Sequence, residues 1–400
     1  MRAYERLLRY VQFDTASDES GTSCPSTAKQ RVLAEALAEE MKGLGIADAR
    51  VDEYGYVYGS IPANAEGLPA IGLIAHMDVV DSVASAPVKP QIIENYDGGP
   101  VTLACGDVLD PAVFPDVAGA KGKSLIVTDG TTTLGADDKA GISEILTACE
   151  RILGDPTLRH GRICIGFTPD EEIGRGADRF DVKGFGADFA YTVDGGTAGE
   201  ISFENFNAAS GLVEVHGLNV HPGNAKNRMK NAGLIAMEFA GMLPPWERPE
   251  HTEGREGFYH LIDMQGSEEY ARLRYIIRDH DRERFEARKA LFCDIAETLN
   301  RRYGAGTVTA EVRDSYYNMY QVIAPRMDIV SRVEDAYRAL GLTPRREAIR
   351  GGTDGSRLSY MGLPCPNIAT GGMNFHGRFE CIAAEDMDVM TEVIVRTLCT

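Results

Sequence analysis

The 400-residue chain contains no run of apolar residues long enough to span a bilayer, and its first residues include no apolar core of signal-peptide length. It also lacks Cys-x-x-Cys pairs, although it has eight cysteines. Cys149, Cys164 and Cys293 stand among apolar neighbours, which is typical of reduced, buried thiols. These absences argue against a membrane-spanning protein and against a disulfide-stabilised secreted one, and they favour a cytoplasmic location.

Basic residues are scarce relative to acidic ones. The chain has 41 lysines and arginines against 60 aspartates and glutamates, which gives a net charge of −19 at pH 7. A surface this negative repels phosphates, so nucleic acid and anionic membranes are not expected as partners. The glycine-rich stretch 351–355 lacks the Gly-Lys-Ser/Thr ending of a phosphate-binding loop, which disfavours nucleotide binding as well.

Histidine and acidic residues follow several predicted strands. The apolar run 71–75 leads into His76-Met77-Asp78, and residues two apart in an extended chain point the same way. An imidazole with a carboxylate beside it is a common arrangement for a metal-ligating histidine. Taken singly, each later acidic group also has an ordinary explanation as a helix cap or a solvated turn. These groups are Asp137-Asp138 before an apolar periodic stretch, Asp170-Glu171-Glu172 after the strand-like run 162–167, and Asp194 beside two glycines.

Together these groups have the chemistry of a two-metal hydrolase. Side chains at the ends of several strands of an open α/β sheet converge where such folds bind their substrates. Two cations about 3.5–4 Å apart require a carboxylate between them and a histidine plus a carboxylate on each outer side. A glutamate next to a ligand can take a proton from the water between the metals. The residues that fit are His76, Asp137, Glu172, Asp194 and His376, with Asp78 and Glu171 beside them.

Motifs along nearly the whole chain resemble those of one enzyme family. Around the candidate ligands they are HMD at 76–78, TTLGADDKAG at 132–141, FTPDEE at 167–172 and YTVDGG at 191–196. Further tracts are FENFNAAS at 203–210, NVHPG at 219–223, EGFYHL at 256–261, YIIRD at 275–279, DSYYNM at 314–319, IRGGTDG at 349–355 and MGLPCPN at 361–367. On these motifs the chain resembles the M20 metallopeptidases, and the further tracts resemble the tripeptide aminopeptidases of that family in particular.

The resemblance implies two zinc ions per subunit. It assigns His76 to one zinc and His376 to the other, with Asp137 bridging the two and with Glu172 and Asp194 completing the sites. It also implies that the peptide bond after Asp137 is cis. Hard carboxylates together with two imidazoles would suit Co²⁺ or Mn²⁺ as well as Zn²⁺, so the metal itself is left open.

Three catalytic roles are implied by the same resemblance. Glu171 is expected to act as the general base and later as the proton donor, and Asp78 to orient His76. His221, in the NVHPG tract, is expected to stabilise the oxyanion of the tetrahedral intermediate. From the residues alone, a histidine before a proline in a turn would instead be structural.

Two further residues are predicted to contact the substrate. Arg278 lies in the strand-like YIIRD run, and its planar guanidinium suits a peptide carboxylate, although an arginine on a strand is more often a solvated surface charge. Asn374 is expected to line the pocket near His376.

The chain is too long for a single typical core, so two domains are expected. Residues 1–206 and 319–400 are predicted to form a catalytic two-zinc domain, and residues 207–318 an inserted lid domain. Within the insertion we predict strands 212–216, 258–265, 271–279 and 307–313 and helices 232–242 and 282–303. This βαββαβ order is the ferredoxin-like arrangement. The predicted fold class is α/β, with a mixed central sheet flanked by helices plus an inserted ferredoxin-like α+β lid.

We therefore predict a metal-dependent aminopeptidase that releases the N-terminal residue from tripeptides by means of a two-zinc activated water. The alternative is another M20-type amide hydrolase, a dipeptidase or an N-acyl amino acid deacylase, because such enzymes share the metal ligands. A metal-binding scaffold without catalysis would be expected to lack Glu171 or a ligand, and none is missing. The expected partners are small peptide substrates; since lids in this family often mediate dimers, a homodimer is a further candidate.

Overall fold

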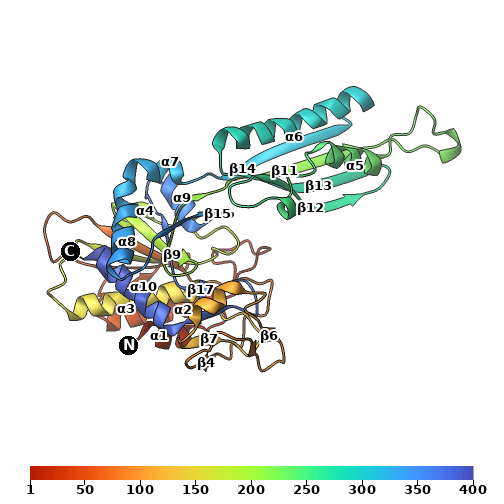
Figure 1. Cartoon of the computed structure of the whole chain (residues 1–400). Coiled ribbons are helices and arrows are strands. Elements are labelled where there is room, and N and C mark those ends of the chain that lie inside the picture. The colour runs from red at the N-terminus through yellow and green to blue at the C-terminus, as the bar shows by residue number, and fades with distance from the viewer. Residues whose placement is uncertain (400) are drawn as a thin grey trace. The chain divides into compact units, whose positions relative to one another are not determined.

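The protein is described from a computed structural model that covers residues 1–399 (Figure 1). The chain divides into two compact units, each described by itself. The first unit comprises Met1–Phe203, Gln321–Glu347 and the chain from Thr353 onward, and the second comprises Glu204–Tyr320 and Ala348–Gly352. Within residues 1–399, no helix has the length and apolarity needed to cross a membrane.

The first unit is built around a mixed eight-stranded sheet of order β1-β2-β8-β3-β9-β16-β10-β15. Strand β3 pairs in parallel with β8 and β9, and β16 pairs in parallel with β9, whereas β2/β8 and β10/β16 are antiparallel. The predicted mixed central sheet is therefore confirmed. The strands are β1 (Arg50–Val51), β2 (Val57–Ile61), β3 (Ile71–His76), β8 (Ile163–Thr168), β9 (Phe189–Gly195), β10 (Glu200–Asn205), β15 (Arg345–Ile349) and β16 (Asn367–Ala369).

Helices flank this sheet, as predicted (Figure 1). Every residue of β3 and β8 is buried, which is expected of strands covered on both faces. Helix α3 contacts β3 and β9, while Ile74 of β3 packs in a cluster with Phe185 of α4 and Leu358 of α9. The helices are α1 (Ala3–Tyr10), α2 (Gln30–Gly43), α3 (Ala136–Gly154), α4 (Val182–Phe185), α7 (Tyr320–Ile323), α8 (Met327–Ala339), α9 (Asp354–Tyr360) and α10 (Ala384–Leu398).

A smaller sheet of order β17-β18-β7-β4 joins two distant parts of the first unit. Its strands β4 and β7 come from the segment between β3 and α3, and β17 and β18 flank the loop 374–380, which carries His376. A buried cluster that includes Leu103, Leu125 and Cys381 fills its core, so the loop is anchored at both ends. The bounds are β4 (Gln91–Ile93), β7 (Leu125–Val127), β17 (Gly372–Met373) and β18 (Cys381–Ala383). Strands β5 (Val101–Thr102) and β6 (Val108–Leu109) form a separate two-stranded sheet.

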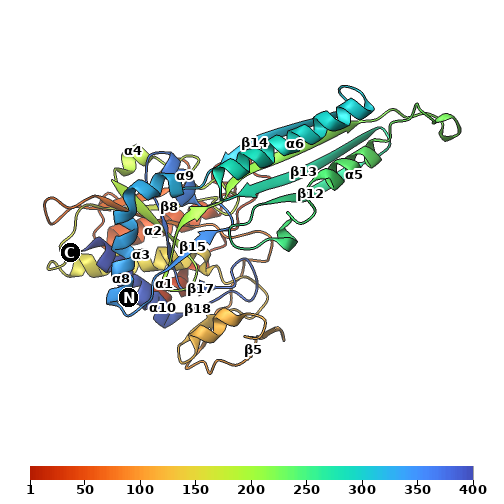
Figure 2. The ribbon, with the colours of Figure 1, turned by 45° about the horizontal axis from the view of Figure 1, so that its top comes forward.

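The second unit has the element order β11-α5-β12-β13-α6-β14, as predicted for the insertion. Its four strands form an antiparallel sheet of order β12-β13-β11-β14, which is the ferredoxin-like strand order. Helices α5 and α6 contact each other and the sheet (Figure 2). The side chains of Phe239, Phe285 and Phe292 belong to the buried cluster of this unit. The bounds are β11 (Asn207–His216), α5 (Ala232–Met242), β12 (Phe258–Gly266), β13 (Tyr270–Asp279), α6 (Arg282–Tyr303) and β14 (Val308–Tyr316).

Three buried asparagines connect the two ends of the stretch Glu204–Tyr320, which forms most of the second unit. The Oδ1 of Asn205 accepts the N–H of Met319 (2.7 Å), and the Oδ1 of Asn207 accepts the N–H of Asn318 (3.0 Å). In return, the Oδ1 of Asn318 accepts the N–H of Asn205 (3.1 Å). Because these side chains satisfy backbone groups that water cannot reach, the two segments hold each other in register.

The segment 348–352 packs in the second unit, although the division predicted from the sequence assigns it to the catalytic domain. The Nε2 of His280 lies 3.1 Å from the carbonyl oxygen of Ile349. A Cβ on Gly352 would lie 2.5 Å from the ring of Tyr316, so only glycine allows this approach. These contacts are distant in sequence, and no local pattern predicts them.

Glu144, in the middle of α3, is a buried acid without a partner. Its side chain is fully buried, and within residues 1–399 neither carboxylate oxygen has a hydrogen-bond partner. Burial, followed by the charges of Asp386 and Asp388, raises the pKa of Glu144 well above its usual value. A carboxyl with a higher pKa in the folded chain than in the unfolded chain binds more protons when folded. Its presence therefore lowers the stability as the pH rises above the unfolded-state pKa.

We expect Glu144→Gln to raise the thermal midpoint at neutral pH, because it removes an acid that is ionised in the unfolded chain and must be protonated, or buried as a charge, on folding. The gain should shrink toward pH 4, where the unfolded chain also protonates the group. Thermal unfolding between pH 4 and 8 measures both effects. Glu150→Gln is the matched control on α3, since Glu150 accepts from Arg6 and should gain nothing. A lower midpoint for Glu144→Gln at pH 8 would contradict the expectation.

Candidate metal centre

The candidate ligands lie where the parallel strands of the large sheet end. His76 is the last residue of β3 and is in register with Thr168, the last residue of β8. Asp194 lies near the end of β9, which runs parallel to β3 on its other side. Because parallel strands end at the same edge of a sheet, their terminal side chains and the turns that follow converge there.

Two groups of three side chains share one aspartate at this edge. His76, Asp137 and Asp194 form one group and Asp137, Glu172 and His376 the other, and in each the potential ligand atoms all lie within 4.8 Å of one another. The two oxygens of Asp137 face different histidines. Oδ1 lies 2.9 Å from Nε2 of His76, and Oδ2 lies 3.0 Å from Nε2 of His376. The structure thus brings together all five residues that the sequence predicts as metal ligands.

The two histidines sit in strongly negative surroundings. Burial disfavours the charged form of His76, but Asp194, Asp137 and Asp78 together raise its pKa well above the usual value. Hydrogen bonds with Asp137 and then Glu172 raise the pKa of His376 to about 10. Both shifts have the same physical origin: an imidazole surrounded by carboxylates gains by carrying a positive charge.

The carboxylates in turn are short of positive partners. Burial would raise the pKa of Asp137, but the contacts with His376 and His76 lower it below its usual value. Burial raises the pKa of Glu172 to about 7. Burial also raises the pKa of Glu171, and the negative charge of Asp194 raises it further. The Oε1 of Glu172 is buried without a partner within residues 1–399. Buried charges of this kind are normally paired or bound to a metal, so the donor set fits two divalent cations.

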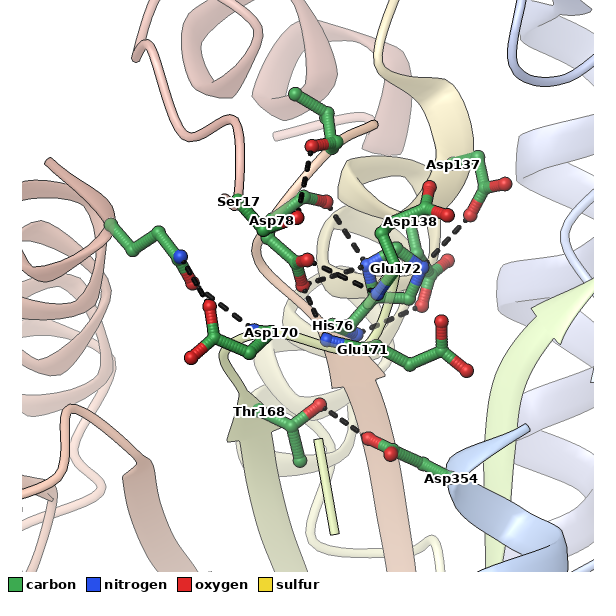
Figure 3. A network of polar contacts seen from close by, with 12 residues as sticks. Ser17, His76, Asp78, Asp137, Asp138, Thr168, Asp170, Glu171, Glu172 and Asp354 are labelled. Atoms are coloured by element: carbon green, nitrogen blue, oxygen red, sulfur yellow. Dashed lines mark hydrogen bonds and ion pairs between the residues drawn. The ribbon is translucent and has the colours of Figure 1, made fainter. Parts of the chain in front are cut away.

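Asp78 holds the turn that carries the two glutamates (Figure 3). Its Oδ1 accepts the N–H of Glu171 (2.9 Å) and its Oδ2 accepts the N–H of Glu172 (3.1 Å). The Nδ1 of His76 lies 3.0 Å from the backbone carbonyl oxygen of Asp78 and 3.4 Å from its Oδ1. The side chain predicted to orient His76 thus fixes the acidic turn, a role that the sequence did not indicate.

Two acids that were not among the predicted ligands, Asp138 and Asp170, also brace the site. Asp138 is fully buried, and its Oδ2 accepts the N–H of His76 (3.1 Å), so it fixes the backbone of a ligand; the peptide bond before it is cis. Asp170 accepts from Nε2 of Gln30 (2.7 Å) and from the N–H of Ser26 (2.6 Å), which ties the acidic turn to the start of α2. A third acid, Glu380, accepts hydrogen bonds from backbone N–H groups before and at the start of α3. It was not singled out from the sequence.

Asn374, predicted to contact the substrate, uses its side chain within its own loop. Its Nδ2 donates to the carbonyl oxygen of Phe379 (3.2 Å). Asn374 and His376 both have φ near +60°, a left-handed conformation that non-glycine residues rarely adopt. The amide hydrogen bond closes the loop 374–380 and so supports the unusual backbone at His376.

The remaining two predicted residues belong to the second unit. His221 is exposed in a short turn, where its Nδ1 accepts the N–H of Gly223 (3.2 Å). Arg278 is largely buried, and burial lowers the pKa of its guanidinium to about 10. Its guanidinium carbon lies 4.9 Å from the centre of the Tyr316 ring.

Arg278 and Tyr316 form a pair of buried donors that lack acceptors. Both are in register with Ala208, on either side of it, so they lie in one row across the sheet with only a small side chain between them. Within the described residues, an Nη atom of Arg278 and the hydroxyl of Tyr316 are buried without a hydrogen-bond partner. Such groups are rare unless a ligand completes them. The sequence did not indicate Tyr316.

Residues 134–400 match peptidase family M20/M25/M40. The chain belongs to this family. Its curated relatives include proteins named peptidase T from Clostridium perfringens (strain 13), 53% identical over 398 residues, and from Desulfitobacterium hafniense (strain Y51), 54% identical over 397 residues. The alignments cover 99% and 98% of this chain, and 98% and 97% of those proteins.

Solved structures of M20 and related enzymes have the same fold. The aminopeptidase PepT of Bacillus cereus and a tripeptidase of Staphylococcus aureus each match with a TM-score of 0.79 at 23% sequence identity, over 99% of this chain and 97% of theirs. A dinuclear metal-binding M20 peptidase of Bacillus subtilis matches with a TM-score of 0.67 at 14% identity, over 99% and 97%. At these identities the structural matches establish the fold of this M20 chain.

We expect the wild-type chain to bind two divalent ions, and single substitutions to change that number in a specific way. Asp137→Ala removes the carboxylate common to both groups and should lose both ions, whereas His376→Ala should retain about one, in the group of His76. Elemental analysis after dialysis gives the ratio. The exposed Asp81→Ala is the control and should keep both ions. Retention of two ions by Asp137→Ala would exclude a shared ligand.

Proposed function

We propose that this chain is a metal-dependent aminopeptidase that releases the N-terminal residue from tripeptides. The proposal rests on Asp137, which belongs to two groups of potential metal ligands. Glu171 precedes one of these ligands in sequence but belongs to neither group, so it is free to act as a base. Relatives named peptidase T, which align over the whole chain at more than half identity, support the substrate class.

In this proposal His76 and Asp194 would hold one ion and Glu172 and His376 the other, and Asp137, which belongs to both groups, would serve both. Zn²⁺ suits this donor set, and Co²⁺ or Mn²⁺ would also fit. When bound, the ions supply Lewis acidity, which lowers the pKa of a water molecule and polarises the scissile carbonyl. The unpartnered Oε1 of Glu172 supports a ligand role for that residue.

Glu171 moves the proton. Asp78 holds its backbone N–H, so the carboxylate is presented from a fixed turn. It takes a proton from the attacking water and delivers that proton to the leaving amine, which lets one group serve as base and then as acid.

We further propose that residues 1–206 and 319–400, apart from the segment 348–352, act as the catalytic domain, and that residues 207–318 act as a lid. His221 donates to the oxyanion of the tetrahedral intermediate. Arg278 binds the carboxylate of the peptide, with the Tyr316 hydroxyl as a second donor. The orphaned donors of this pair support the assignment, because a carboxylate would satisfy both. Asn374, which lies in the same loop as His376, lines the substrate pocket beside that histidine.

The proposed location is the cytoplasm, where the eight cysteines, which are all unpaired thiols in the structure, would stay reduced. Small peptides are the proposed partners, and a homodimer remains a prediction.

Hydrolysis of a free tripeptide by the metal-loaded protein tests the function. We expect release of the N-terminal residue from the tripeptide and much slower turnover of the matching dipeptide, tetrapeptide and N-acetylated tripeptide, with products identified chromatographically. Glu171→Gln should keep the metals and lose most of kcat, on the order of 10²-fold or more. Faster cleavage of the dipeptide or the N-acetylated peptide would point to a dipeptidase or a deacylase instead. Near-normal kcat in Glu171→Gln would remove this residue from its role.

Arg278→Lys should raise KM for a free tripeptide by about 10–100-fold, because lysine keeps the charge and loses the planar pair of donors. It should also abolish the preference for a free C-terminal acid over the C-terminal amide. Arg274→Lys, four residues earlier on the same strand and exposed, is the matched control. A variant at 278 that still prefers the free acid as strongly as wild type would exclude carboxylate binding by Arg278.

A further inference from the structure

The carboxylate of Glu380 accepts several hydrogen bonds from one short loop. Its side chain is almost fully buried, at 1% exposure, and its carboxylate accepts four hydrogen bonds from the five residues before and at the start of α3. Oε2 accepts three of them and Oε1 the fourth. The donors to Oε2 are the hydroxyl of Thr133 and the N–H groups of Leu134 and Gly135, both at 2.8 Å, and the donor to Oε1 is the N–H of Asp137 at 2.9 Å.

The loop is shaped to receive this carboxylate. Gly135 has φ of +74°, so consecutive N–H groups turn inward around a single anion. Asp137 and Asp138 have non-helical backbone angles, so these N–H groups lie before the regular part of α3. Without Glu380, these donors would be buried with no partner.

The fourth bond is the one that bears on the metal centre. Asp137 is held on its backbone side by Oε1 of Glu380, and on its side-chain side it contacts the Nε2 atoms of His76 and His376. Glu380 follows His376 by four residues, so a single segment supplies one ligand and the acceptor that fixes the backbone of the shared ligand.

We infer that Glu380 is a positioning residue for the metal centre, which sets the place of Asp137 and thereby the affinity for both ions. This inference rests on the proposed function. Glu380 reaches neither group of potential ligands itself. It acts through the backbone of Asp137.

Glu380→Gln separates this role from simple loss of a buried side chain. A glutamine has one acceptor oxygen, and three of the four donors converge at the position of Oε2. The amide oxygen should take that position, which leaves the amide NH₂ facing the N–H of Asp137. Two donors then oppose each other at the shared ligand, while the rest of the loop keeps its acceptor.

Titration with Co²⁺, followed by its visible absorption, and competition with Zn²⁺ measure the consequence. We expect Glu380→Gln to weaken metal binding by about 10–100-fold, as is usual when a group that supports a ligand is lost, and to alter the Co²⁺ spectrum. Glu385→Gln is the matched control. Glu385 also accepts from a backbone N–H and a hydroxyl, both of Ser124, so the same substitution there should leave affinity and spectrum unchanged.

The outcomes separate the two proposals. Wild-type affinity and an unchanged Co²⁺ spectrum in a folded Glu380→Gln protein would overturn the role of Glu380 and leave the proposed function standing. A wild-type chain that binds neither metal would overturn the proposed function, and this inference with it. If Glu380→Gln does not fold, Thr133→Val decides, because it removes one donor to Oε2. We expect it to weaken metal binding by about two- to tenfold, and unchanged binding would overturn the role.

Discussion

Buried carboxylates that accept backbone N–H groups are the constraint on which the metal centre depends. Strand ends and helix starts expose N–H groups that have no partner within their own element, and at this site water cannot reach them. Asp78 accepts the N–H groups of the turn 171–172, and Asp138 accepts that of His76. Glu380 accepts the N–H groups of residues 134, 135 and 137. Each loop is thus fixed by an acid that lies on a different segment.

This solution has an electrostatic cost. Every acid that braces a loop adds to the negative charge of the ligand acids, and burial makes that charge harder to sustain. The raised pKa values of His76 and Glu172 both reflect it. A pair of divalent cations would relieve the repulsion without disturbing the bonds to the backbone. Bracing and metal binding therefore support each other.

The five residues that meet at the candidate metal centre could be predicted from the sequence. Four of them stand at or just after the end of a strand, or at the start of a helix, whereas the ligand role of His376, in the loop 374–380, was implied by the family resemblance. The order of elements in the second unit could also be predicted, since the apolar periods of its strands and helices are regular. The bracing contacts could not. Glu380 and the loop 133–137 are far apart in sequence, as are Gly352 and Tyr316, and such contacts exist only after the sheets have formed. The roles of Asp78 and Asn374 needed atomic distances for the same reason.

The segment 348–352 has a consequence for modularity. Because it belongs to the second unit, that unit is built from two stretches of chain, and the chain crosses between the units four times instead of twice. Arg350 donates to the carbonyl oxygen of Gly254, and Gly352 makes room for the ring of Tyr316. A recombination event or a chimera that exchanged residues 204–320 alone would separate these partners. Residues 204–320 and 348–352 should therefore be inherited together, so recombination that exchanges this unit should exchange both stretches or neither of them.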